Sequence, residues 1–156
     1  MKKLSTFLAA AIISFGFNTA FGQDPTPLYA GHVTWTSGSN ELDEIDTTGG
    51  MLTVVSTVTL TSDAGAVNGV YGLSTDPTDD QMYILYQSAG GSTSRRLGQL
   101  DPTTGAITDV GVSGNLTDID FGPDGTLYGT TGSSSPDFSL MEVDKTTGSA
   151  SVLTVK

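Results

Sequence analysis

Short runs in which apolar and polar residues alternate fill the chain from about residue 28 onward, and turn-forming residues separate them. A period of two is typical of half-buried β-strands. In the C-terminal part it predicts strands at residues 116–121, 126–131, 138–144 and 149–155. Residues 122–125 (Gly-Pro-Asp-Gly) and 146–148 (Thr-Thr-Gly) have the composition of the turns between them. No apolar i, i+3, i+4 pattern persists beyond the N-terminal segment, so we expect no helix after residue 22.

Several landmarks recur in the same order along the chain. Three segments have an apolar residue before an Asp, and a Gly follows that Asp by four positions; the Asp residues are Asp46, Asp101 and Asp144. A tyrosine lies upstream of each, at Tyr29, Tyr83 and Tyr128. Residues 71–77 also parallel residues 117–123, at an offset of 46. A unit of four short antiparallel strands that recurs every 45 or so residues indicates a β-propeller blade.

The predicted fold class is therefore all-β, a propeller-like repeat of four-stranded antiparallel blades. We expect units at about residues 28–60, 67–112 and 115–155, and the first of them begins on its second strand. This gives about 11 strands and an incomplete ring of about three blades, whereas closed propellers typically have four to eight. Three interpretations remain open: a piece of a longer propeller, a ring completed by self-association, and an open stack with exposed edges.

The repeated motifs resemble those of a known group of proteins. The apolar-Asp-x-Thr-Thr-Gly pattern of residues 143–148, after residues 118–129, is similar to blade repeats of secreted bacterial β-propellers. These include the NHL, gluconolactonase-like and YVTN-type groups, and the resemblance covers roughly residues 28–155. It implies a propeller fold. Gluconolactonase-like members hold a divalent cation with Glu, Asn and Asp residues from several blades, and no specific set of this kind is matched here.

The N-terminal segment has the features of a secretory signal peptide. A basic start at Lys2 and Lys3 precedes a short apolar stretch, and small residues occupy the positions before Gln23. We expect residues 1–22 to be removed before Gln23, leaving residues 23–156 as the repeat domain in the periplasm or outside the cell. The apolar stretch is shorter than the roughly 20 residues of a membrane-spanning helix, and no later stretch approaches that length.

Composition narrows the function classes. The chain has 156 residues, with 17 Asp and Glu against 6 Lys and Arg, and a net charge of −11. Phosphate binding needs clustered basic residues, so this charge argues against a nucleic-acid partner. There is no Cys and a single His, His32. The lack of Cys excludes a disulfide framework, a Cys-ligated zinc site and a thiol nucleophile. A Ser-His-Asp triad is nearly excluded as well, because it would need His32.

Asp118, Asp120 and Asp124 are the candidate metal ligands, with calcium as the cofactor to consider. Asp118 and Asp120 share one face of a strand expected to line the central channel, and Asp124 follows in the next turn. The alternative is that Asp124 only shapes a turn beside a polar strand end. Gly72 and Ser74 occupy the matching positions of the preceding unit, so a ring of carboxylates is not repeated.

The other polar landmarks have structural interpretations. The repeated Asp46, Asp101 and Asp144 are expected to start turns by accepting backbone N–H hydrogen bonds. The three tyrosines are expected to pack between blades, and the Arg95-Arg96 pair is interpreted as solvated loop charge. No catalytic residue is assigned. The prediction is a secreted propeller-repeat protein that binds a protein or carbohydrate ligand, or a second copy of itself. The alternative is part of a divalent-metal-dependent propeller hydrolase or lactonase.

Overall fold

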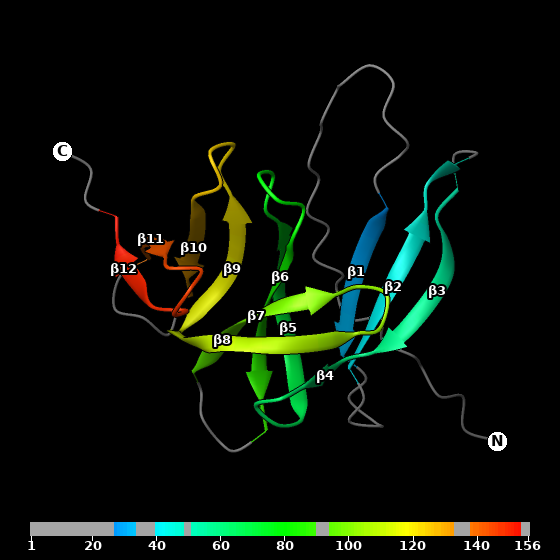
Figure 1. The fold of residues 1–156 in the computed structure, drawn as a ribbon, viewed down its shortest axis with the longest axis horizontal. Coiled ribbons are helices and arrows are strands. Elements are labelled where there is room, and N and C mark those ends of the chain that lie inside the picture. The colour runs from blue at the N-terminus through cyan, green and yellow to red at the C-terminus, as the bar shows by residue number, and fades with distance from the viewer. Residues whose placement is uncertain (1–26, 34–39, 49–50, 90–93, 133–137, 154–156) are drawn as a thin grey trace.

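The chain forms β-strands and no α-helix within the residues that the computed structural model describes, which are 27–33, 40–48, 51–89, 94–132 and 138–153 (Figure 1). The strands are β1 (Leu28–Val33), β2 (Asn40–Asp46), β3 (Thr53–Thr59), β4 (Thr61–Ser62), β5 (Val67–Thr75), β6 (Met82–Ser88), β7 (Arg95–Asp101), β8 (Ala106–Gly114), β9 (Leu116–Phe121), β10 (Leu127–Thr131), β11 (Leu140–Val143) and β12 (Ala150–Val152). The all-β prediction is confirmed. In the same residues no helix could serve as a membrane span. The predicted signal peptide and its cleavage point before Gln23 lie outside the described residues.

Three sheets follow one another along the longest axis of the molecule (Figure 1). The first has the strand order β1-β2-β3, the second β4-β8-β7-β6-β5, and the third β12-β11-β10-β9. We call the groups β1–β3, β5–β8 and β9–β12 the first, second and third blades. Consecutive strands within each blade are antiparallel neighbours, as in a meander. The arrangement is that of an incomplete propeller.

The described strands number twelve, against the expected 11 or so. The extra strand, β4, has two residues and pairs in parallel with β8, with Thr61 opposite Ala106. The Thr61 N–H also donates to the carbonyl of Gly105 at 3.0 Å. The chain leaving the first blade therefore lies along the outer edge of the second. A two-residue strand has no periodicity of its own, so only its tertiary partner identifies it.

Two apolar cores lie between the blades, one on each face of the second blade. Along β6, Ile84 and Tyr86 contribute to the core shared with the first blade, and Tyr83 and Leu85 to the core shared with the third. This alternation follows from the period of two, because successive side chains of a strand point to opposite faces. All four side chains are at most 3% exposed. Burying a side chain of this size stabilises the fold by about 1.5–3 kcal/mol.

The same cross-strand pair recurs in each blade at equivalent positions. Leu28 lies opposite Ile45 in the first blade, Met82 opposite Leu100 in the second, and Leu127 opposite Val143 in the third. Leu100 and Met82 belong to the core between the first and second blades, and Leu127 and Val143 to the core between the second and third. Each such pair therefore packs toward the preceding blade where one is present.

The repeated aspartates start turns, as predicted from their spacing. The carboxylates of Asp46, Asp101 and Asp144 accept the backbone N–H of the residue two positions later, at 2.7, 2.9 and 2.8 Å. Hydrogen bonds from threonine N–H and hydroxyl groups lower the pKa of each carboxyl group below its ordinary value. In the second and third blades the turn closes on Gly105 and Gly148, both with φ of +74°.

Each of these two turns also rests on the last strand of the blade before it. A Cβ on Gly105 would lie 2.4 Å from the carbonyl oxygen of Thr59, at the end of β3. A Cβ on Gly148 would lie 2.8 Å from the carbonyl carbon of Gly111, in β8. Contacts shorter than 3 Å leave no room for a side chain. Glycine is therefore required at these positions by packing between blades as well as by the positive φ.

Candidate functional site

Strands β5 and β9, the first strands of the second and third blades, bring equivalent positions of the sequence repeat into contact. The Ser74 hydroxyl donates to Asp120 Oδ1 at 2.8 Å, and these two residues are 46 positions apart. A Cβ on Gly72 would lie 2.8 Å from Asp118 Oδ1, which is the other pair at the same offset. Neighbouring blades thus place equivalent residues face to face, and the small Gly72 leaves room for the Asp118 carboxylate.

Asp118 and Asp120 lie close enough to influence each other, and Asp124 serves a different purpose. Burial raises the pKa of the Asp118 carboxyl, and the charge of Asp120 raises it further. Asp124 accepts the backbone N–H of Thr126 at 3.1 Å, which lowers its pKa and holds the β9–β10 turn. Within the described ranges no group of three or more His, Cys, Asp or Glu side chains is placed to hold a metal ion. Calcium binding at Asp118 and Asp120 stays a prediction.

His32 lies between two carboxylates on the face of the first blade that points away from the second. Its Nε2 is 3.2 Å from Glu41 Oε2 and 3.5 Å from Asp43 Oδ2. Thr57 donates its hydroxyl to Asp43 at 2.6 Å. Glu44 instead accepts from Ser56 on the opposite face, so the acidic side chains diverge as the alternation predicted. The cluster is a partly solvated group of close polar contacts.

The interpretation of Arg95 and Arg96 as solvated loop charge is wrong. Both residues begin β7. Arg96 makes a two-point ion pair with Asp109 on β8, and one of its hydrogen bonds, from Nε to Oδ1, is 2.6 Å long. Arg95 lies over the Tyr71 ring, 4.1 Å from its centroid, and donates to Asn115. Their partners are remote in sequence, so the residues around the pair gave no signal of this role.

The hydroxyl of Tyr86 links the Arg96–Asp109 ion pair to strand β4. It donates to Asp109 Oδ1 at 2.7 Å and lies 2.8 Å from the Ser62 hydroxyl on β4. Burial, and then the neighbouring Asp109 carboxylate, raise the pKa of Tyr86 to about 12. The tyrosine therefore stays protonated and acts as a structural donor.

A buried ion pair that the sequence did not predict joins the second and third blades. The Asp76 side chain is completely buried and pairs with the ammonium group of Lys145, from the β11–β12 turn. Thr78 donates both its N–H, at 2.9 Å, and its hydroxyl, at 2.6 Å, to the other carboxylate oxygen. Burial alone would raise the pKa of Asp76, but the hydrogen bonds from Lys145 and Thr78 outweigh it and hold the pKa at about 2.

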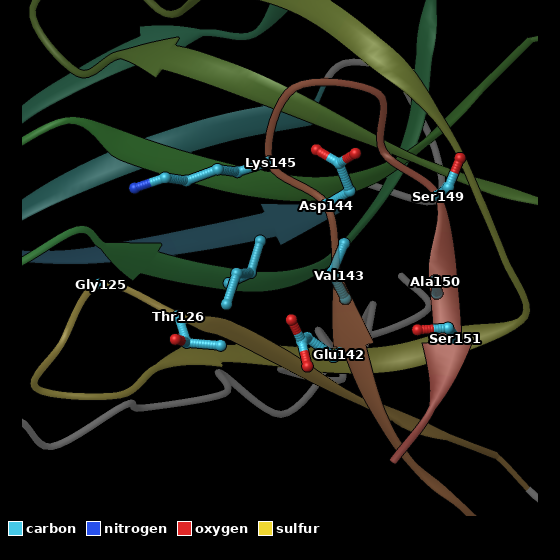
Figure 2. A pocket seen from close by; sticks show the side chains of 10 residues that line it. Gly125, Thr126, Glu142, Val143, Asp144, Lys145, Ser149, Ala150 and Ser151 are labelled. Atoms are coloured by element: carbon cyan, nitrogen blue, oxygen red, sulfur yellow. The ribbon is translucent and has the colours of Figure 1, made fainter. Parts of the chain in front are cut away.

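A shallow pocket of about 460 Å³ opens beside this turn, at one end of the third blade (Figure 2). Leu127, Val143 and Ala150 contribute its apolar part. Its polar side chains are those of Thr126, Glu142, Asp144, Lys145, Ser149 and Ser151. The chain's only histidine is His32, so no imidazole is available here to activate a serine. These groups can donate and accept hydrogen bonds, which suits the binding of a polar group and identifies no catalytic step.

The comparisons with known proteins give a structural similarity and no family. No family model and no curated protein matches the sequence. Among solved structures, the chain is similar to two putative 6-phosphogluconolactonases, one from Bacteroides fragilis NCTC 9343 and one from Bacteroides uniformis ATCC 8492. Both are 18% identical to this chain over 80% of its length, with TM-scores of 0.42 and 0.43. The match spans about a third of those chains, 34% and 35%. A likeness at this level of identity and TM-score says nothing about the reaction of this chain.

Proposed function

We propose that this protein is a secreted or periplasmic propeller-repeat protein that works by binding another macromolecule through the uncovered face of its third blade. One observation carries the proposal. Leu140, on β11, occupies the repeat position at which Leu97 in the second blade is fully buried, yet Leu140 is 48% exposed. An apolar side chain at a position built to be covered indicates a contact surface.

The repeat identifies the other members of this surface. Tyr83 and Leu97 lie on the same face of the second blade beneath the third, and both are buried in the core between the blades. Tyr128 and Leu140 are their equivalents one blade later, and in the described part of the chain no strand packs over them. Glu142 and Ser151, which lie opposite each other in the β11–β12 pair, alternate onto the same side as Leu140. We call Tyr128, Leu140, Glu142 and Ser151 the uncovered face of the third blade.

A photo-crosslinking amino acid at position 140 tests the proposal in the organism that makes the protein. The control is the same substitution at Val152, which is 63% exposed on the same blade but pairs with Met141 on the opposite side. We expect adducts from position 140 and none from position 152. Absence of adducts at position 140 in folded protein, or equal adducts at both positions, would contradict a binding role for this face.

The proposed location has its own test. The mature protein, isolated from the periplasm or the medium, should begin at Gln23, which N-terminal sequencing or intact mass would show. A full-length chain retained in the cytoplasm would contradict secretion while leaving the crosslinking result to stand or fall by itself.

A further inference from the structure

We propose that the partner of the uncovered third-blade face is a second copy of this chain, joined head to tail through the outer face of its first blade. This inference rests on the proposed function and names the partner of that surface. The two surfaces differ in composition, so the contact is heterologous, and repeated contacts of this kind generate either a closed ring or an open filament.

The two internal junctions show what kind of surface covers a Tyr–Leu position. Tyr29 and Leu42 of the first blade are covered by the second blade, in a core that contains Met82 and Leu100. Tyr83 and Leu97 of the second blade are covered by the third, in a core that contains Leu127 and Val143. In both junctions the covering residues are the same recurrent cross-strand pair.

The first blade carries this covering pair, and among the described residues no strand packs against it. Leu28 lies opposite Ile45 at the positions of Met82–Leu100 and Leu127–Val143, and both side chains alternate away from the second blade. Within the described residues, the first blade therefore offers a covering pair without a covered position, and the third offers the Tyr128–Leu140 position without a covering pair. A second copy would bring the two together in the geometry that the chain already uses twice.

The repeated turn supports the same direction of assembly. In the second and third blades the Asp-started turn rests on the last strand of the preceding blade, at Thr59 and at Gly111. The first blade has its own turn, in which Thr48 donates to Asp46 at 2.7 Å. In the described residues this turn contacts no preceding strand, and no turn contacts β12. Head-to-tail contact would bring the two together.

Charge sets the conditions for this contact. The outer face of the first blade carries Glu41 and Asp43, and the third-blade face carries Glu142. Without Lys2 and Lys3 the net charge of −11 becomes −13, so two copies of residues 23–156 also repel each other at long range. Salt screens such repulsion, with a Debye length falling from about 10 Å at 0.1 M to about 3 Å at 1 M. Association should therefore strengthen as salt is added, which is opposite to the behaviour of a contact held by ion pairs.

The experiment measures mass by light scattering on purified residues 23–156, at low and high micromolar concentration, in dilute buffer and in about 0.5 M NaCl. Leu140→Glu removes one surface and Ile45→Glu the other, and each variant alone should be a monomer at concentrations where the unaltered chain associates. Val152→Glu is the matched control and should associate normally. The two monomeric variants mixed together retain one intact junction and should form a 1:1 dimer that grows no further. The dissociation constant of that dimer should rise about tenfold or more when either remaining surface is also altered.

Circular dichroism of each variant shows that it is folded. A folded monomer in high salt would overturn the self-association. So would association that neither variant disrupts, or a mixture of the two variants that stays monomeric. If the chain is a monomer while crosslinks at position 140 join it to a different protein, the proposed binding function stands and the second-copy partner is wrong. If crosslinks at position 140 are also absent, both proposals fail.

Discussion

The Asp76–Lys145 ion pair gives the sharpest test of how the blades are held together. It joins the β5–β6 turn of the second blade to the β11–β12 turn of the third, and Asp76 is completely buried. Replacing Asp76 by Asn keeps the shape of the side chain and removes its charge. The amide can still accept from Thr78, but its NH₂ group would face the Lys145 ammonium with donor against donor.

The size of the effect follows from the pKa. Asp76 has a pKa of about 2 in the folded protein against an ordinary value of 3.8. Folding therefore favours the ionised form, and the difference corresponds to about 2 kcal/mol of stability at neutral pH. This is an upper value for the contact with Lys145, because Thr78 supplies part of it and the Lys145 side chain is 34% exposed. We expect Asp76→Asn to lower the free energy of unfolding by about 2 kcal/mol at pH 7.

The pH dependence has a definite sign. Because the folded pKa is lowered, the stabilisation is fully present above the unfolded pKa and is lost as pH falls through the folded value, between about pH 5 and pH 2. Across that range the free energy of unfolding of the parent should fall as Asp76 is protonated. The Asp76→Asn variant has no such group, so the unfolding free energies of the two proteins should converge as the pH is lowered. Lys145→Met should show a smaller loss at pH 7 in the same direction.

Urea unfolding followed by circular dichroism provides the measurement. The set comprises the parent, both single variants, the double variant and the control Asp79→Asn, an exposed turn residue whose bond from the Gln81 N–H an amide can also accept. The sum of the two single-variant losses in unfolding free energy should exceed the loss in the double variant, as for residues in direct contact. Equal stability of parent and Asp76→Asn at pH 7, or curves that stay parallel down to pH 2, would refute the reasoning.

Three further predictions concern packing and metal binding. Gly98→Ala should lower stability by about 1–3 kcal/mol in urea unfolding, because its Cβ would lie 2.3 Å from Ile107 Cγ2 in a packed core; an unchanged midpoint would contradict this. Gly105→Ala should be more destabilising than Gly114→Ala. Both residues have φ of +74°, but only at Gly105 would a Cβ meet a neighbour within 4 Å. Gly114→Ala should therefore lower the free energy of unfolding by about 1 kcal/mol, and Gly105→Ala by more. If calcium binds through Asp118, it should raise the melting temperature of the parent but not that of Asp118→Asn, and a rise of equal size in both would place any bound ion elsewhere.

The repeated turns and the contacts between equivalent positions could be predicted from the sequence. The Asp-x-Thr spacing predicted turns at Asp46, Asp101 and Asp144 because an aspartate and the N–H two residues later are brought together by the backbone itself. The 46-residue offset likewise predicted the equivalence of Ser74 and Asp120, and these residues now form a hydrogen bond. Tyr29 and Tyr83 pack between blades as expected.

The charged contacts between residues remote in sequence could not be predicted in this way. Asp76 and Lys145 are 69 positions apart, and nothing in either local motif distinguishes a buried ion pair from two solvated turn residues. Arg96 was misinterpreted for the same reason, since Asp109 becomes its neighbour only when β7 pairs with β8. Long side chains find partners according to how the strands are placed.

The sequence by itself determined the all-β class, the repeat, the turns and the face to which each strand residue belongs, because these depend on periods of a few residues and on the equivalence of units. Only the tertiary structure decided the β4 pairing with β8, the Asp76–Lys145 ion pair between blades and the exposure of Leu140. Each of these depends on which blade lies beside which. The equivalent repeat position is buried at Leu97 and half exposed at Leu140, and among the described residues the difference is the presence of a neighbouring blade.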